Sequence, residues 1–119
     1  MNLLTDDIRE KLLRNGRLRE HYQRDDMAEP DFLPVVKLFT PASDCVWLLT
    51  ELDPQEPDIA FGLCDLGMGY PELGTVSIRE LESVRGGLRL PIERDENFIA
   101  TKTISGYADE ARERGAICS

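Results

Sequence analysis

The sequence predicts an α+β fold, in which an antiparallel sheet meander of approximately four strands follows one N-terminal helix and precedes two C-terminal helices. Short apolar runs rich in β-branched and aromatic residues follow one another in the middle of the chain, separated by turn residues. Capped helical patterns lie before and after them. Because the strands are grouped and do not alternate with helices, this order favours α+β over a doubly wound parallel sheet. A length of 119 residues fits one domain, residues 1–119.

The N-terminal helix is expected in "LTDDIREKLLRNG" (4–16). Thr5 is a suitable N-cap, and the two acids after it place negative charge at the positive end of the helix dipole. Apolar side chains recur every four residues and would face a core. Asn15-Gly16 is a helix stop signal, so "RLREHYQ" (17–23) is expected to form a short second helical piece.

Four short apolar runs in the middle of the chain are typical of strands: "VVKLF" (35–39), "CVWLLTEL" (45–52), "DIAFGLC" (58–64) and "LGTVSI" (73–78). The second and third are joined by "DPQEP", in which two prolines bracket a hairpin connection. The second run is apolar on both of its alternating faces. It is therefore expected to be a central strand that is covered on both sides.

The C-terminal part contains two further helix patterns. Ser77 and Glu80 form a capping-box pattern, and Gly86-Gly87 would end the helix that they start. The segment after it is irregular, with room for one short strand. "SGYADEARERG" is expected to be the last helix, capped by Ser105 and ended by Gly115.

The negative charge of the protein is concentrated in the middle of the chain. The formal net charge is −9; residues 1–24 carry +2, residues 25–84 carry −11, and residues 85–119 carry 0. Between Lys37 and Arg79 there is no Lys, Arg or His. Free nucleic acid would be repelled by such a region, so direct nucleic-acid binding is not expected, whereas a basic protein partner would be attracted.

Six carboxylates in the stretch 50–74 are the candidate binding surface: Glu51, Asp53, Glu56, Asp58, Asp65 and Glu72. They are expected mainly at turns and strand ends, and Glu51 and Asp53 are expected to point into water. The leading hypothesis is a non-enzymatic binding protein that offers these acids to a basic partner, such as a protein that normally binds nucleic acid, by mimicking nucleic-acid charge. The competing interpretation is a solvated face that only confers solubility.

No metal site and no cofactor are expected. The acids around the predicted hairpin lack the register of an EF-hand loop, and a chain whose one histidine is His21 cannot build a His-rich transition-metal site. A two-carboxylate hydrolase site from Glu51 and Asp53 would need a cleft, whereas these residues approach a turn. Cys64 with His21 is the one thiol–imidazole pairing to consider, and no nucleophile motif accompanies it.

Two alternatives to the binding hypothesis stay open. One is a carboxylate-dependent or metal-dependent enzyme that uses acids near Asp65 together with "IERD" (92–95). The other is a structural subunit that assembles into an oligomer through an apolar sheet edge. In the same charged segment, Arg94 lies between Glu93 and Asp95, and the three are expected to form an ion-pair network that fixes a loop.

A cytoplasmic location is expected, without a membrane partner. The N-terminus acquires acids too early for a secretory signal, and no apolar run approaches the roughly 18 residues of a membrane span. Cys45, Cys64 and Cys118 are widely separated and form no Cys-x-x-Cys pair, so neither a disulfide framework nor a zinc site is indicated.

Several segments, in order, resemble a family of small proteins known as a domain of unknown function and typically encoded on bacterial plasmids and integrative elements. The chain departs from the family pattern at Leu48, where an aromatic residue is common, and at Glu96, where an apolar residue is common. The resemblance implies an accessory or anti-defence role, such as inhibition of a restriction or CRISPR nuclease. It rests on "LLTDDIREKLL", "VVKLFTP", "WLLTELD", "FGLCDLG", "ELGTVSIRELESVRG" and "LPIERDENF" within residues 3–98.

Overall fold

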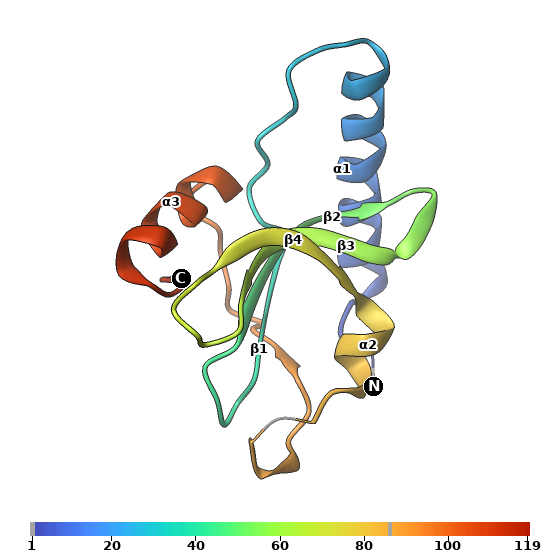
Figure 1. Ribbon diagram of the computed structural model, residues 1–119. Coiled ribbons are helices and arrows are strands. Elements are labelled where there is room, and N and C mark those ends of the chain that lie inside the picture. Colours follow the sequence, from blue (N-terminus) through green and yellow to red (C-terminus); the bar gives the residue numbers. More distant parts are fainter. Residues whose placement is uncertain (1, 86) are drawn as a thin grey trace.

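The computed structural model describes residues 2–85 and 87–119, which form a five-stranded antiparallel sheet with helices on both of its faces (Figure 1). The predicted α+β class is confirmed, with one more strand than the approximately four expected. The strand order is β4-β3-β2-β1-β5. The elements are α1 Asp6–Arg24, β1 Val36–Phe39, β2 Val46–Asp53, β3 Glu56–Asp65, β4 Glu72–Ser77, α2 Ile78–Ser83, the 3₁₀ turn η1 Gly87–Arg89, β5 Glu93–Arg94 and α3 Ile104–Arg114.

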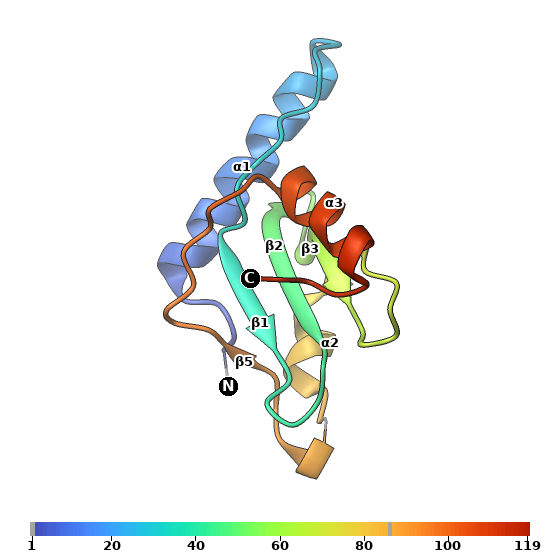
Figure 2. The same ribbon diagram turned by 90° about the vertical axis from the view of Figure 1, so that its left-hand side faces the viewer.

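The sheet separates two apolar clusters. On one face, α1 packs through Leu12 against Trp47 and Leu49 of β2. On the other face, α3 packs through Tyr107 against Leu48. Figure 2 shows the two helices on opposite sides of the strands. The prediction that β2 is a central strand covered on both sides is confirmed, because its six residues from Trp47 to Leu52 are all buried.

Helix α1 is continuous through Asn15-Gly16, so the predicted stop and second helical piece are wrong. Gly16 is buried, and a Cβ atom at this position would overlap the backbone carbonyl of Leu52. Asn15 Nδ2 donates a hydrogen bond to the carbonyl oxygen of Thr50 at 2.8 Å. The pair that resembles a stop signal is therefore the place where the helix backbone crosses β2 in close contact. Thr5 caps the helix as predicted, since its Oγ1 accepts from Ile8 N at 3.2 Å.

A register shift in β2 decides which side of the sheet its last residues face. Leu49 pairs with Gly62, whereas Glu51 pairs with Phe61, so Thr50 is an extra residue in this strand. Paired residues of an antiparallel ladder point to the same face, and consecutive residues point to opposite faces. The bulge therefore places Glu51 on the same side of the sheet as Phe61 and on the side opposite to Leu49.

The C-terminal helices follow the predicted order with different ends. Ser77 caps α2, its Oγ accepting from Glu80 N at 3.2 Å, as the capping-box pattern predicts. The helix ends at Ser83, before the predicted Gly86-Gly87 stop, of which residue 86 lies outside the described residues. Helix α3 ends at Gly115 in a left-handed conformation with φ 76°, as predicted.

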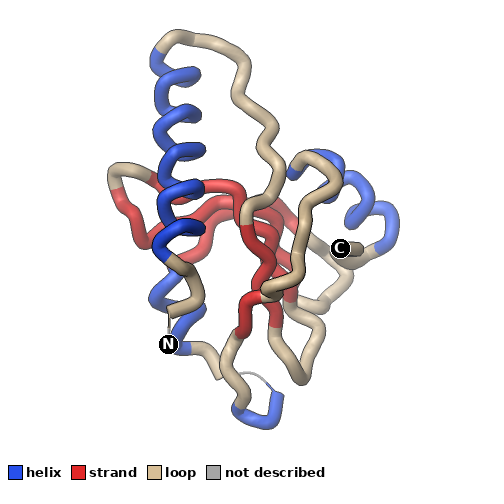
Figure 3. Tube along the Cα trace, turned by 180° about the vertical axis from the view of Figure 1, so that it is seen from behind, coloured by secondary structure: helices blue, strands red, loops and turns tan. Residues whose placement is uncertain are grey.

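The predicted N-cap of α3 is wrong. The N-cap is Thr103, two residues earlier than expected, and Ser105 makes a different contact. Its hydroxyl donates to Asp31 Oδ2, and its backbone N–H donates to Asp31 Oδ1 at 3.1 Å. The Ser105 hydroxyl holds the pKa of the Asp31 carboxyl below its usual value. These bonds tie α3 to the long connector that runs from the end of α1 back to the sheet (Figure 3).

Candidate functional site

The six predicted surface acids do not gather on one surface. The β2–β3 hairpin carries Asp53 and Glu56 at its tip, whereas Asp65 lies at the far end of β3 and Glu72 pairs with Cys64 beside it. Seven residue steps separate Asp58 from Asp65, which is about 23 Å of extended strand. The acids therefore form two groups at opposite ends of the hairpin.

Two of the six, Glu51 and Asp65, are buried, so the expectation that Glu51 points into water is wrong and Asp65 is not part of an exposed surface. Glu51 is 6% exposed and Asp65 is 2% exposed. Asp65 accepts hydrogen bonds from Gly67 N at 2.8 Å and from Ile117 N at 3.0 Å. Its carboxylate therefore holds the β3–β4 turn against the C-terminal segment, because charged acceptors bind backbone N–H groups strongly.

Asp58 is half-buried and stabilises α2. Its Oδ1 accepts from Arg79 N at 2.9 Å, and its Oδ2 accepts from the Ser77 hydroxyl at 2.5 Å. The Ser77 hydroxyl is the main cause that lowers the pKa of Asp58, and the Arg79 N–H adds to it. Asp58 and Ser77 together satisfy two N–H groups of the first turn of α2. Asp53, Glu56 and Glu72 are exposed.

The predicted ion-pair network of Glu93, Arg94 and Asp95 is wrong in its partners. Arg94 pairs with Glu96 at 3.5 Å and donates to the carbonyl oxygen of Leu3 at 2.5 Å. Asp95 faces Lys37 of β1, with 3.7 Å between Nζ and Oδ2. Neighbouring residues of a strand point to opposite faces, which separates Arg94 from the acids on both sides of it.

A cleft of about 480 Å³ lies between the C-terminal half of α1 and the outer ends of β2, β3 and β4. Its charged lining consists of four carboxylates and one guanidinium: Glu20, Glu29, Glu51, Asp53 and Arg19. We refer to it as the acidic cleft. Of the six predicted acids, it contains Glu51 and Asp53.

The positive charge of the acidic cleft is already engaged. Arg19 Nε lies 2.5 Å from Glu51 Oε2, and Nη1 lies 3.1 Å from Glu29 Oε2. The guanidinium also lies 5.5 Å from the ring centre of Phe32 and 5.6 Å from that of Phe61. Both distances are within the range of cation–π attraction. Arg19 is thus held by two acids and two rings, and it forms no ion pair with the other two carboxylates of the cleft, Glu20 and Asp53, within the described residues.

Helix α1 and the hairpin tip are tied together at the rim of the acidic cleft. Gln55 Nε2 donates to Glu20 Oε2 at 3.1 Å, and Gln55 N donates to Asp53 Oδ1 at 2.9 Å. Glu29 accepts from Gln23 Nε2 at 3.0 Å. The rim acids are therefore oriented by amide donors, which leaves each carboxylate with free acceptor positions.

Sequence reasoning missed Arg19, Glu20 and Glu29 as parts of the site. They lie outside the base-free stretch, and Arg19 is 32 residues from Glu51. The bulge at Thr50, which places Glu51 on the side of Phe61, has no signature in a run that is apolar on both faces. One local signal does indicate the position of Arg19. It lies seven residues after the buried Leu12, a spacing that places both residues on the same face of the helix.

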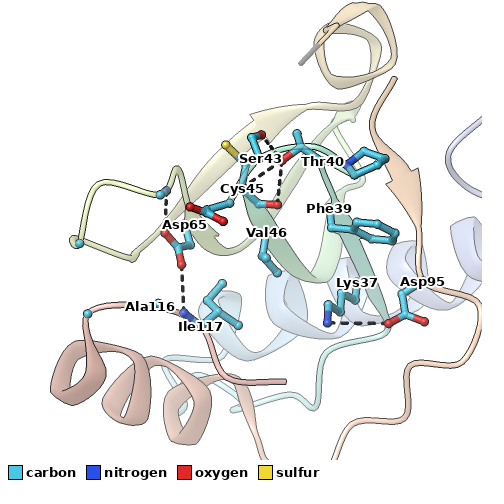
Figure 4. A pocket seen from close by; sticks show the side chains of 15 residues that line it. Lys37, Phe39, Thr40, Ser43, Cys45, Val46, Asp65, Asp95, Ala116 and Ile117 are labelled. Atoms are coloured by element: carbon cyan, nitrogen blue, oxygen red, sulfur yellow. Dashed lines mark hydrogen bonds and ion pairs between the residues drawn. The ribbon is translucent and has the colours of Figure 1, made fainter. Parts of the chain in front are cut away.

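A second cleft, of about 560 Å³, contains Asp65 and Asp95, two of the acids considered for an enzyme (Figure 4). Figure 4 shows them at opposite ends, with Val46 and Phe39 between them. Strand order separates them by three strand spacings, about 14 Å. Asp65 is held by two backbone N–H groups, and Asp95 accepts from Asn97 N at 2.9 Å. The two carboxylates do not form a pair.

The cysteines form no disulfide, and Cys64 is a half-buried thiol. Burial raises the pKa of Cys64 to about 11. His21 is exposed and lies 3.2 Å from Asp25, so the thiol–imidazole pairing of Cys64 and His21 is not supported. Among residues 2–85 and 87–119, no three His, Cys, Asp or Glu side chains gather in a way that could hold a metal ion. No helix in the part of the chain that the structure describes is long and apolar enough to cross a membrane.

Comparison with known proteins places the chain in a family. The family described as "Protein of unknown function (DUF2958)" matches residues 3–118. The chain belongs to this family. The resemblance found in the sequence, to a family known as a domain of unknown function, is thereby confirmed. Comparison with curated proteins gave no significant match, and comparison with solved structures gave none either.

Proposed function

We propose that this member of the DUF2958 family is a non-enzymatic binding protein, whose acidic cleft receives a basic segment of a protein partner. The observation that carries the proposal is the charge of the cleft, in which four carboxylates face one guanidinium that is already engaged. A concave surface of one sign raises the local concentration of ligands of the opposite sign and speeds their encounter. The preformed contacts of Arg19 and Gln55 mean that little ordering is needed on binding.

Basic protein segments fit this cleft better than free cations or nucleic acid do. A lysine or arginine side chain carries an apolar stem behind its charged head. The cleft offers both kinds of surface, because Pro54, Ile59 and Phe61 lie beside the acids. Nucleic acid would meet a repulsive surface. The chemistry therefore favours a protein that presents exposed Lys or Arg.

Within this proposal, the partner belongs to the proteins that normally bind nucleic acid. Such proteins carry basic grooves that hold phosphates, and carboxylates on a rigid surface can occupy them competitively. The setting that we propose is that of a cytoplasmic accessory protein of a mobile element, acting against a host nuclease complex. This setting predicts that the protein competes with DNA for the nuclease, and that competition weakens as salt is raised.

The direct test measures binding of an arginine-rich peptide by calorimetry at low and high salt. The test variant combines Glu20→Gln, Glu29→Gln and Asp53→Asn, which remove charge from the cleft while preserving side-chain shape. Exposed ion pairs contribute roughly 0.2–1 kcal/mol each, so the loss of three weakens binding by about 3-fold to 150-fold. Asp58 is left unchanged, because its removal would disturb the start of α2.

The matched control combines Glu93→Gln, Asp109→Asn and Glu113→Gln, three exposed acids outside the cleft. It changes the net charge by the same amount. We expect binding of the control to stay close to that of the wild type, with a similar loss at high salt. If both triple variants lose the same affinity, net charge and not the cleft governs binding, and the proposal is wrong.

A further inference from the structure

Helix α3 obtains the cap of its first turn from another part of the chain. Its N-cap residue, Thr103, makes no side-chain capping bond within the described residues. Instead, the backbone N–H of Ile104 donates to the carbonyl oxygen of Phe32 at 2.7 Å. The backbone N–H of Ser105 donates to Asp31 Oδ1 at 3.1 Å, and the Ser105 hydroxyl donates to Asp31 Oδ2. Two N–H groups that the start of a helix leaves unpaired are thus satisfied by the connector.

The charge of Asp31 suits its place at the start of α3. A negative charge is favourable at the positive end of a helix dipole. The Ser105 hydroxyl is the largest cause that lowers the pKa of Asp31, so the bond between them favours the charged carboxylate. The neighbouring backbone bond to Phe32 starts from Ile104, which is buried. The start of α3 and residues 31–32 of the connector therefore form one unit.

The same stretch of the connector forms one wall of the acidic cleft. Glu29 lines the cleft, and its Oε2 lies 3.1 Å from Arg19 Nη1. The carbonyl oxygen of Pro30 accepts from Arg19 Nη2 at 3.3 Å, and the guanidinium lies 5.5 Å from the ring centre of Phe32. Residues 29–32 are therefore held between α1 on one side and α3 on the other (Figures 1 and 3). We refer to these four residues as the connector bridge.

The contacts of Glu29 with α1 do not fix its position alone. Its side chain is 60% exposed, and an ion pair of that exposure contributes little, because water screens the charges. Gln23, which also donates to Glu29, is exposed as well. Glu29 lies two residues before Asp31, and Pro30 between them restricts the backbone on both of its sides. The position of Glu29 at the cleft therefore depends on the anchoring of Asp31 to α3.

We propose that Asp31 and Ser105 are positioning residues of the acidic cleft, which fix the connector bridge to the start of α3 and so hold Glu29 where it meets the partner's basic segment. This inference rests on the proposed function and adds to it two residues that do not line the cleft. With this anchor intact, Glu29 is ordered before the partner arrives. Without it, binding must first order the side chain and its backbone, and the affinity is lowered by that cost.

The test measures binding of the arginine-rich peptide by calorimetry, with Ser105→Ala as the first variant. This substitution removes the hydroxyl donor and leaves the charge and the backbone N–H groups of the protein unchanged. Ser105→Thr keeps a hydroxyl at this position. The matched control is Ser83→Ala, which removes another exposed serine hydroxyl, one that donates to the carbonyl oxygen of Glu80 at 2.8 Å outside the cleft. Hydrogen exchange of the amides in residues 29–32 reports the order of the connector bridge in each variant.

We expect Ser105→Ala to weaken peptide binding by about 2-fold to 12-fold, which is the cost of ordering one long side chain on binding. The same variant should speed hydrogen exchange in the connector bridge. Ser105→Thr and Ser83→Ala should stay close to the wild type in both measurements. Asp31→Ala, which removes both bonds to Ser105, should weaken binding more than Ser105→Ala does.

A double-mutant cycle with Glu29→Gln separates positioning from a general loosening of the fold. Without its charge, residue 29 gives the peptide little to bind, so the loss caused by Ser105→Ala should disappear in this background. For Asp31→Ala, the part of the loss that persists with Glu29→Gln reports the direct effect of the Asp31 charge. A loss from Ser105→Ala of equal size in both backgrounds would overturn the inference. Wild-type affinity of Ser105→Ala, or unchanged exchange of its connector bridge, would overturn it too.

These outcomes differ from those that contradict the proposed function. The cleft triple variant carries Glu20→Gln, Glu29→Gln and Asp53→Asn. If the wild type does not bind the arginine-rich peptide, or if this variant and its control bind it equally, the acidic cleft is not the binding site, and the inference fails together with the proposed function. If the cleft triple variant loses affinity and Ser105→Ala does not, the proposed function stands and the positioning role of Ser105 is wrong.

Discussion

Removing Arg19 should destabilise the protein far more than removing an arginine of an exposed ion pair. In the substitution Arg19→Leu, Glu51 loses a partner whose Nε lies 2.5 Å from its carboxylate. The side chain of Glu51 is 8% exposed, so water cannot replace the lost contact. Breaking a buried pair by removing one partner costs about 3–5 kcal/mol, because a buried charge is left uncompensated. Loss of the two cation–π contacts adds to this.

The assay is urea unfolding at neutral pH, followed by the fluorescence of Trp47, the one tryptophan of the chain, which lies buried in the α1-side core. The matched control is Arg17→Leu, which breaks the exposed Arg17–Glu10 pair. In this pair the arginine side chain is 54% exposed and the glutamate side chain is 60% exposed. An exposed pair of this kind contributes about 0–1 kcal/mol. A domain of this size has a free energy of unfolding of about 5–15 kcal/mol, so the two variants are readily distinguished.

The double variant Arg19→Leu, Glu51→Met tests the cause of the effect. With both charges gone, the desolvation penalty of the unpaired carboxylate disappears, and apolar side chains of similar size fill the site. We expect most of the lost free energy of unfolding to return, to within about 1–2 kcal/mol of the wild type. If Arg19→Leu lies within about 1 kcal/mol of the wild type, or the double variant is no more stable than the single, the interpretation of the pair as buried and coupled is wrong.

Three further predictions follow from individual contacts. The Cys64 thiol has a pKa of about 11, so at pH 8 about one molecule in a thousand should carry the thiolate. Alkylation followed by mass spectrometry should therefore label the exposed Cys118 before Cys64. Equal labelling rates of the two cysteines in the folded protein would contradict this. Because the pKa of Asp58 is lowered on folding, its contribution to stability is present above its unfolded pKa and is lost as pH falls through the folded value. Asp58→Ala should therefore lower the melting temperature at pH 7, and the difference should vanish at strongly acidic pH; a gap that is constant with pH would refute the carboxylate's role. Gly16→Ala should destabilise by about 1–3 kcal/mol in spite of alanine's higher helix propensity, whereas Gly106→Ala in α3, which meets mainly a flexible lysine side chain, should change the unfolding midpoint little.

The fold could be predicted from the sequence because its main signals are local. Apolar periodicity, the Thr5 and Ser77 caps and the Gly115 stop each depend on a few neighbouring residues, and each is confirmed. Gly16 shows where local reasoning fails. Its signal is that of a helix stop, but the helix continues because the glycine allows a close crossing with β2. A contact between residues that are distant in the sequence thus overrides the local preference.

Of the candidate site, only the negative sign of its charge could be predicted from the sequence. The base-free stretch directs attention to the β2–β3 hairpin. Whether an acid of this stretch reaches solvent depends on the hydrogen-bond donors that surround it. Glu51 meets Arg19, Asp65 meets two backbone N–H groups, and Asp58 meets the first turn of α2. None of these partners lies within the local window in which a sequence pattern is read.

The buried acids explain why a count of charges overstates the proposed binding surface of this protein. The negative charge of a carboxylate that is held by a salt bridge or by backbone N–H groups is largely compensated within the fold. Such a carboxylate attracts a basic partner only weakly. What remains at the hairpin tip is Asp53 and Glu56, and the approach of α1 adds Glu20 to them. The hydrogen bond from Gln55 to Glu20 holds α1 at a fixed distance from the hairpin tip, so Glu20 stays close to Asp53 and Glu56. The negative surface of the acidic cleft is therefore assembled by tertiary packing. The proposed function predicts that a substitution that removes the Gln55 contact weakens binding of the basic peptide without removing a charge.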